Sequence, residues 1–119
     1  MIAARAAVAF VALEHLAFMA LEMFLWRTPT GLRVFGMTAA QAESSAVLAA
    51  NQGLYNGMLA AGLIASFFTA PATALALRTY ILTYIAVVGA YGAWTVSPRI
   101  LLVQTLPAVL ALAAVRFAR

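Results

Sequence analysis

Side chains that can exchange protons or donate hydrogen bonds interrupt two apolar segments of this chain. The segment "LEHLAFMALEMFLW" contains Glu14, His15 and Glu22 and ends at Trp26. The segment "NQGLYN" adds a second polar set, which consists of Asn51, Gln52, Tyr55 and Asn56. A carboxyl group can give or take a proton, and carboxamides can orient a bound molecule by hydrogen bonds. The two segments therefore predict a site for acid–base chemistry or for the binding of a polar group.

The composition places these side chains in a membrane protein. Of the 119 residues, 66% are hydrophobic and only 8% are charged, whereas about 25% of the residues in soluble domains are charged. The seven basic residues are all arginines and lie at the ends of apolar runs, where they predict interfacial anchors and not a nucleic-acid surface. The chain has no cysteine and one histidine, which excludes disulfides, thiolate metal sites and bis-histidine haem ligation within one chain.

Four apolar runs predict an all-α membrane protein, an antiparallel bundle of four transmembrane helices with both termini on the same side. Each run is long enough to cross a hydrocarbon layer of about 30 Å. The chain is expected to form a single domain over residues 1–119. The predicted helices cover residues 3–26, 39–69, 79–96 and 100–117.

The second predicted helix has two opposed faces. Small residues recur every four positions on one face, a stripe that lets helices approach closely in lipid; they are Ala49, Gly53, Gly57 and Ala61. The polar set at residues 51–56 fills an arc of about 140° on the opposite side. Because ionisable groups facing lipid cost at least about 2.5–3.5 kcal/mol, we expect the carboxyls of the first helix to turn inward and meet this amide face.

Polar groups on different predicted helices lie at the same depth below the membrane surface. Counted from the interface near Trp26, Glu22, Asn51 and Gln104 each lie about 6–7 Å deep. His15 and Asn56 lie near the midplane, at about 15–16 Å. The sequence therefore predicts a polar cavity with an acidic wall and an amide wall. Gln104 has a local structural explanation as well, because Pro107 leaves the carbonyl of Val103 without its usual donor.

The arginines favour one orientation. Arg5, Arg78, Arg116 and Arg119 lie on the predicted terminal side, and Arg27, Arg33 and Arg99 lie on the other. The positive-inside rule therefore favours cytoplasmic termini, and a bacterial inner membrane is the expected location.

The chain resembles a known family in several blocks. "LEHLAFMALEMFLW", "RVFGMT", "NQGLYNGMLAAGL", "GAYGAWTV" and "LLVQTLPAVLAL" are similar to the small integral membrane proteins of domain-of-unknown-function family 1304. The blocks cover nearly the whole chain, and one departure is Met58, where the family pattern usually has Phe. The resemblance implies four transmembrane helices and implies no activity.

Three functions fit the polar set. One is binding or acid–base processing of a lipid-soluble small molecule, with Glu14, His15 and Glu22 as acid–base candidates. The ligand-binding candidates are Asn51, Gln52, Tyr55, Asn56, Gln104 and Trp26. A small proton- or cation-coupled transporter or channel is the alternative, and a structural role in which the polar groups hold the helices together is the third. The sequence leaves open whether the protein is an enzyme.

No metal or cofactor is predicted. Glu14 and His15 are adjacent and point about 100° apart, and the spacing matches no standard metal motif. No nucleotide-binding motif occurs, and membrane lipid is the expected partner. A short chain of this kind usually needs a second copy to line a pathway, and the Ala49, Gly53, Gly57 and Ala61 face, or an equivalent one, could form a homo-oligomer.

Overall fold

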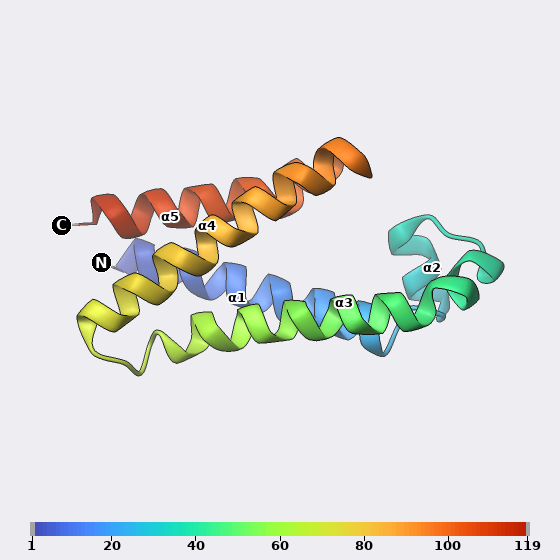
Figure 1. Ribbon diagram of the computed structural model, residues 1–119, viewed down its shortest axis with the longest axis horizontal. Coiled ribbons are helices and arrows are strands. Elements are labelled where there is room, and N and C mark those ends of the chain that lie inside the picture. The colour runs from blue at the N-terminus through green and yellow to red at the C-terminus, as the bar shows by residue number, and fades with distance from the viewer. Residues whose placement is uncertain (1, 119) are drawn as a thin grey trace. The chain divides into compact units, whose positions relative to one another are not determined.

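A computed structural model describes residues 2–118, and every regular element in that range is a helix. Figure 1 shows the order of the elements along the chain. They are α1 (Ile2–Met23), α2 (Pro29–Phe35), α3 (Ala39–Ala65), α4 (Pro71–Thr95), the π-helical turn η1 (Leu101–Thr105) and α5 (Leu106–Phe117). The all-helical prediction is confirmed.

Contacts group the chain into two compact units. The central unit is Leu13–Ala60, and the terminal unit combines Met1–Ala12 with Ala61–Arg119. The central unit holds the second half of α1, all of α2 and most of α3. The terminal unit holds α4, η1 and α5, and α5 runs back antiparallel to α4 (Figure 1). The single four-helix domain stays a prediction.

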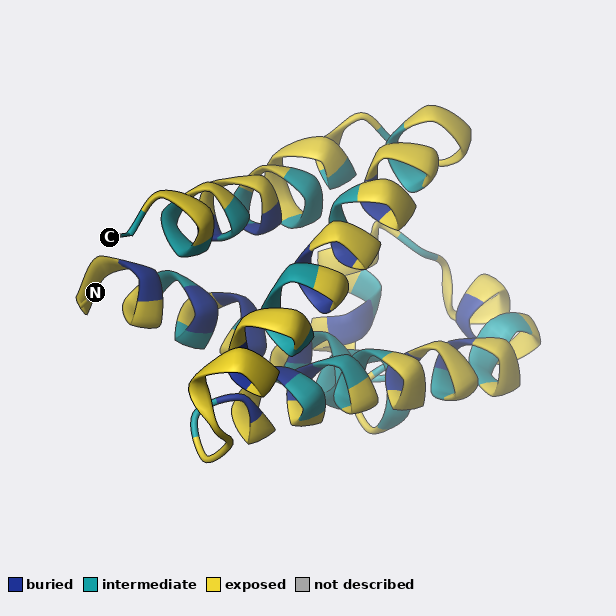
Figure 2. Cartoon of the chain, turned by 60° about the vertical axis from the view of Figure 1, so that its left-hand side comes forward, coloured by how far each residue is buried: buried dark blue, intermediate teal, exposed yellow. Residues whose placement is uncertain are grey.

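Within residues 2–118, two helices are long and apolar enough to cross a membrane by length and composition. They are Ile2–Met23 and Pro71–Thr95. Buried positions follow narrow stripes on the helices, and much of the remaining helix surface is exposed (Figure 2). Several of these exposed positions are large and apolar, such as Phe10, Leu48 and Val87, which are 58%, 74% and 63% exposed.

The start of α3 follows directly from its sequence. The backbone N–H of Thr38 donates to Oε1 of Gln41 at 2.9 Å, and the backbone N–H of Gln41 donates to Oγ1 of Thr38 at 3.1 Å. This is a reciprocal capping box, which satisfies two backbone donors that a helix start leaves unpaired.

The predicted start of the third long helix at residue 79 is wrong. The helix begins at Pro71, eight positions earlier, and the break before it covers only residues 66–70. A proline lacks the backbone donor that an interior helical position needs, but the first turn of a helix does not need that donor. Pro71 therefore begins α4, although it lies between the second and third predicted helices.

The first helix is also shorter than predicted and is followed by an unpredicted one. α1 ends at Met23, and α2 starts behind Thr28, whose hydroxyl oxygen accepts from the backbone N–H of Gly31 at 3.3 Å. Pro29 occupies the first turn, and Gly36 ends α2 with a φ of 62°, a conformation that favours glycine. The segment from 27 to 37, which lies between the first two predicted helices, is thus an ordered helical connection.

A π-helical turn lies ahead of Pro107. The backbone N–H of Leu106 donates to the carbonyl of Leu101, five residues back. Such a turn shifts the hydrogen-bond pattern by one residue next to the position where Pro107 supplies no donor. In the same turn, Oγ1 of Thr105 donates to the carbonyl of Ala86 at 3.3 Å, which fixes η1 against α4.

Candidate functional site

The central unit is organised by a close approach of α1 and α3. A Cβ atom added at Gly53 would lie 2.6 Å from Cγ of Met23 and 3.2 Å from the backbone oxygen of Met19. A Cβ atom at Gly57 would collide with the Met19 side chain. The small-residue stripe of α3 therefore packs on α1, as expected for helices that approach closely through glycine.

This packing brings one predicted carboxyl to one predicted amide. Nδ2 of Asn56 donates a hydrogen bond to Oε1 of Glu22 at 2.7 Å. Both residues are half-buried. The glycines explain the contact, because Asn56 lies about 60° around α3 from Gly53 and so borders the packing face. A carboxyl oxygen and an amide donor from two helices thus form the polar centre of this unit.

Glu14 and His15 lie on α1 about two turns from Glu22. His15 is fully buried and meets the ring of Phe18 edge-on, with 5.2 Å between the ring centroids. It shares a helix face with Glu22, seven residues on, whereas Glu14 is rotated by about 80°. Oε2 of Glu14 is buried and has no hydrogen-bond partner among residues 2–118. A buried carboxyl oxygen without a hydrogen-bond partner can take up a proton, accept a hydrogen bond or bind a cation.

Three residues of the predicted amide wall do not face α1, and this part of the prediction is wrong. Asn51, Gln52 and Tyr55 are exposed. Nδ2 of Asn51 donates to the carbonyl of Val47 at 2.8 Å, so this amide is hydrogen-bonded to the backbone of its own helix. The physical reason is that α1 packs on the glycine stripe, and the opposite arc of α3 must then point outward.

Trp26 does not extend the acidic face of α1, because the helix ends three residues earlier. Its Nε1 donates to Oγ of Ser45 at 3.1 Å, and its ring lies 4.6 Å from that of Phe35, measured between centroids. These contacts tie the start of α3 to α2. Trp26 thus has a structural explanation that does not require a ligand.

Gln104 belongs to the terminal unit and lies in η1. Its side-chain amide makes no hydrogen bond to another protein group within residues 2–118, and the repair of the carbonyl of Val103 by a polar group or water stays a prediction. A Cβ atom at Gly89 of α4 would lie 3.3 Å from Cγ of Gln104, which places this side chain against α4.

The small-residue face is partly covered within the chain. Gly53 and Gly57 contact α1, so a second copy would need a different face, and the homo-oligomer stays a prediction. Within residues 2–118 no group of three or more His, Cys, Asp or Glu side chains could hold a metal ion.

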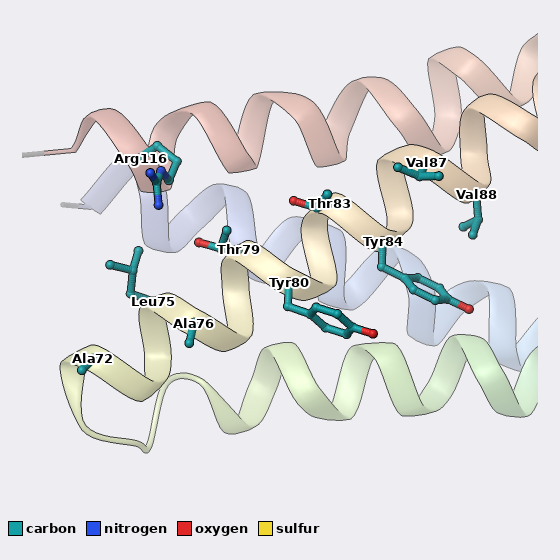
Figure 3. Close-up of a pocket in the computed structure, with 10 residues that line it drawn as sticks. All are labelled: Ala72, Leu75, Ala76, Thr79, Tyr80, Thr83, Tyr84, Val87, Val88 and Arg116. Atoms are coloured by element: carbon teal, nitrogen blue, oxygen red, sulfur yellow. The ribbon is translucent and has the colours of Figure 1, made fainter.

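The terminal unit contains a groove that the sequence pattern does not predict. The groove has a volume of about 800 Å³ and follows one face of α4 from Ala72 to Val88 (Figure 3). Among the described residues that line it, Arg116 of α5 is the charged one. Tyr80 and Tyr84 also line it. The signal that could have found the groove is the recurrence of small and hydroxyl residues every three to four positions along this helix face.

Comparisons with known proteins identify the family. The sequence matches the family described as "Protein of unknown function (DUF1304)" over residues 9–116. It is 41% identical over 104 residues to the "Uncharacterized protein YpaA" of Lactococcus lactis subsp. lactis (strain IL1403), covering 86% of this chain and 87% of that protein. No solved structure matches the chain significantly. The chain therefore belongs to the DUF1304 family.

The packing of α1 on α3 can be tested through Gly53. Replacement of Gly53 by Leu inserts a side chain where Met23 and the Met19 backbone already lie, and overpacking of this kind costs about 1–3 kcal/mol. We expect Gly53→Leu to lower the free energy of unfolding by that amount, measured by circular dichroism during titration of the micelle-bound protein with dodecyl sulfate. Ala61→Leu, at an exposed position of the same stripe, is the control and should unfold like wild type. Equal unfolding of both variants and wild type would contradict the packing.

Proposed function

We propose that this DUF1304 protein is a polytopic integral membrane protein that binds a lipid-soluble small molecule at Glu22 and Asn56, with Glu22 as its acid or base. The observation that carries the proposal is the 2.7 Å hydrogen bond between Glu22 and Asn56. An ionisable side chain in an apolar helix is costly to retain, and such side chains usually belong to functional sites. A hydrogen bond between helices in membranes averages only about 0.6 kcal/mol, so holding two helices together does not require a carboxyl group.

The membrane part of the proposal rests on lengths and exposed surfaces. α1 and α4 meet the length and hydropathy requirements of a span. α3 has 27 residues, which corresponds to about 40 Å of helix, and residues 99–117 give about 28 Å. We therefore propose four spans, with the shortfall in the hydropathy of α3 caused by its polar first turns and by its amides. The many exposed apolar side chains would then face lipid.

A four-span chain makes a simple topological prediction. The natural chain has no cysteine, so single cysteines can be introduced without removing others. With cytoplasmic termini, Thr30→Cys and Ser97→Cys should react with a membrane-impermeant maleimide in intact cells, because α2 and the turn after α4 would both connect spans on the outer side. Thr69→Cys should react only after the membrane is permeabilised. Reaction of Thr30→Cys and Thr69→Cys from the same side would contradict the span count.

The chemistry at Glu22 follows from its partner. Because the Asn56 amide donates to one carboxyl oxygen, the other oxygen of Glu22 is left to exchange a proton with a ligand or to accept a hydrogen bond from it. Asn56 holds the carboxyl in one orientation, which favours a defined direction of proton transfer. A ligand for this site would carry one polar group on an apolar body, since the Met19 and Met23 side chains pack beside the pair at Gly57 and Gly53.

Access of a lipid-soluble molecule to Glu22 can be measured with dicyclohexylcarbodiimide. This apolar reagent adds to a carboxylic acid, and rearrangement leaves the whole reagent bound to the carboxyl as an acylurea. We expect mass spectrometry of the membrane-embedded protein to find the adduct on Glu22, and Glu22→Gln to remove it. Glu43 is the internal comparison, because it is exposed and paired with Arg27 at 3.2 Å; Glu43→Gln should leave the labelling unchanged. A protein modified at Glu43 but not at Glu22 would contradict the proposal.

Proton- or cation-coupled transport is the second candidate function. It is favoured by the buried oxygen of Glu14 that has no hydrogen-bond partner within residues 2–118. A carboxyl in this state could bind a proton and a cation in turn. The same labelling experiment separates the two functions. Adducts confined to Glu14, with protection by a cation added to the buffer, would favour transport over ligand binding at Glu22.

A further inference from the structure

The terminal unit has an unbalanced charge. Its residues include five of the seven arginines, at positions 5, 78, 99, 116 and 119, and none of the three glutamates, which are Glu14, Glu22 and Glu43. The chain contains no aspartate. Arginine side chains in this unit therefore have no acidic side chain of the same unit with which to pair.

Two of these arginines are held around one aromatic ring. The guanidinium carbon of Arg5 lies 5.0 Å from the centroid of the Phe67 ring, and that of Arg78 lies 4.8 Å from it. Both distances fall within the range of cation–π interactions. Nε of Arg78 also donates to Oγ of Ser66 at 2.8 Å, and its Nη2 donates to the carbonyl of Ser66 at 3.1 Å. The ring and the serine thus hold both guanidinium groups within about 5 Å of the same ring, and a bound anion would relieve the repulsion between these two like charges.

A small groove lies at this pair. It has a volume of about 250 Å³, and Arg5, Arg78 and Ser66 line it together with Thr69. Leu75 lines both this groove and the larger groove along α4, so the two are neighbours. Arg116 lines the larger groove and lies near its Leu75 and Thr79 end (Figure 3).

The larger groove has the dimensions and chemistry of an acyl-chain site. Its lining residues on α4 extend from Ala72 to Val88, which corresponds to about 24 Å along the helix. Apart from Arg116 the groove is lined by apolar, threonine and tyrosine side chains. A free anion would leave this groove unused, whereas a lipid would occupy both grooves at once.

We infer that the terminal unit binds an anionic phospholipid, with its phosphate between Arg5 and Arg78 and an acyl chain in the groove along α4. Arginine binds phosphate oxygens by paired, charge-assisted hydrogen bonds, which are roughly twice as strong as hydrogen bonds between neutral groups. Basic pockets of this type between helices are suited to lipid headgroups at the cytoplasmic surface, where anionic lipids are enriched. The site does not depend on Glu22 and adds a lipid specificity to the proposed function.

The inference is tested with full-length protein in nanodiscs of phosphatidylcholine alone or with phosphatidylglycerol. Native mass spectrometry should show wild type retaining phosphatidylglycerol, and thermal unfolding should occur at a higher temperature when this lipid is present. Arg5→Gln should lower the affinity about tenfold, as expected for the loss of one charge-assisted contact. Arg99→Gln removes the same charge from the same unit at a residue that lines neither groove, and it should bind like wild type.

Two further variants separate the loss of a charge from unfolding and from the loss of the apolar groove. Arg78→Gln also loses its bonds to Ser66 and could unfold, but Arg5 makes no hydrogen bond to any residue within 2–118, so Arg5→Gln isolates the loss of the charge. Ala76→Phe would fill the larger groove and should reduce retention of phosphatidylglycerol while leaving Arg5 and Arg78 in place. Equal retention by wild type, Arg5→Gln and Ala76→Phe would overturn the inference. Stabilisation by inorganic phosphate equal to that by phosphatidylglycerol would assign the site to a free anion and would also overturn it.

Discussion

The close approach of α1 and α3 at two glycines is the constraint on which the candidate site depends. Without a side chain at Gly53, the backbone of Met19 comes close enough that the neighbouring Glu22 can meet Asn56. A bulky residue at Gly53 would separate the helices, and the 2.7 Å hydrogen bond could not persist. The polar pair is therefore a consequence of packing by small residues. The positions of its carboxyl and amide groups depend on that packing.

The distribution of charge separates two kinds of chemistry along the chain. All three carboxyl side chains belong to the central unit, where Glu43 pairs with Arg27 at the surface and Glu22 pairs with an amide. The charged side chains of the terminal unit are all arginines, and two of them, Arg5 and Arg78, lie against the ring of Phe67. Carboxyl groups favour proton exchange, and arginines favour phosphate. The proposed small-molecule site at Glu22 and the proposed phospholipid site therefore take different ligands and lie in different units of the chain.

The sequence predicts local features, such as the start of a helix, better than it predicts which helix faces pack together. The spacing of Thr38 and Gln41 predicts the start of α3, because a capping box needs only neighbouring residues. Pro71 misleads, since a proline can end one helix or begin the next. The contact of Glu22 with Asn56 agrees with their predicted faces, but the outward position of the other amides does not. Spacing alone does not decide whether the glycine stripe or the polar arc faces the neighbouring helix.

A double-mutant cycle at Glu22 and Asn56 tests the central claim most directly. Glu22→Leu, Asn56→Leu and the combined variant would each be unfolded by dodecyl sulfate, and their free energies of unfolding compared with that of wild type. If the two side chains bond each other, the single changes should couple by about 0.6–1.7 kcal/mol, the range of hydrogen bonds between helices in membranes. Effects that add to within about 0.3 kcal/mol would contradict the pairing and, with it, the proposed site.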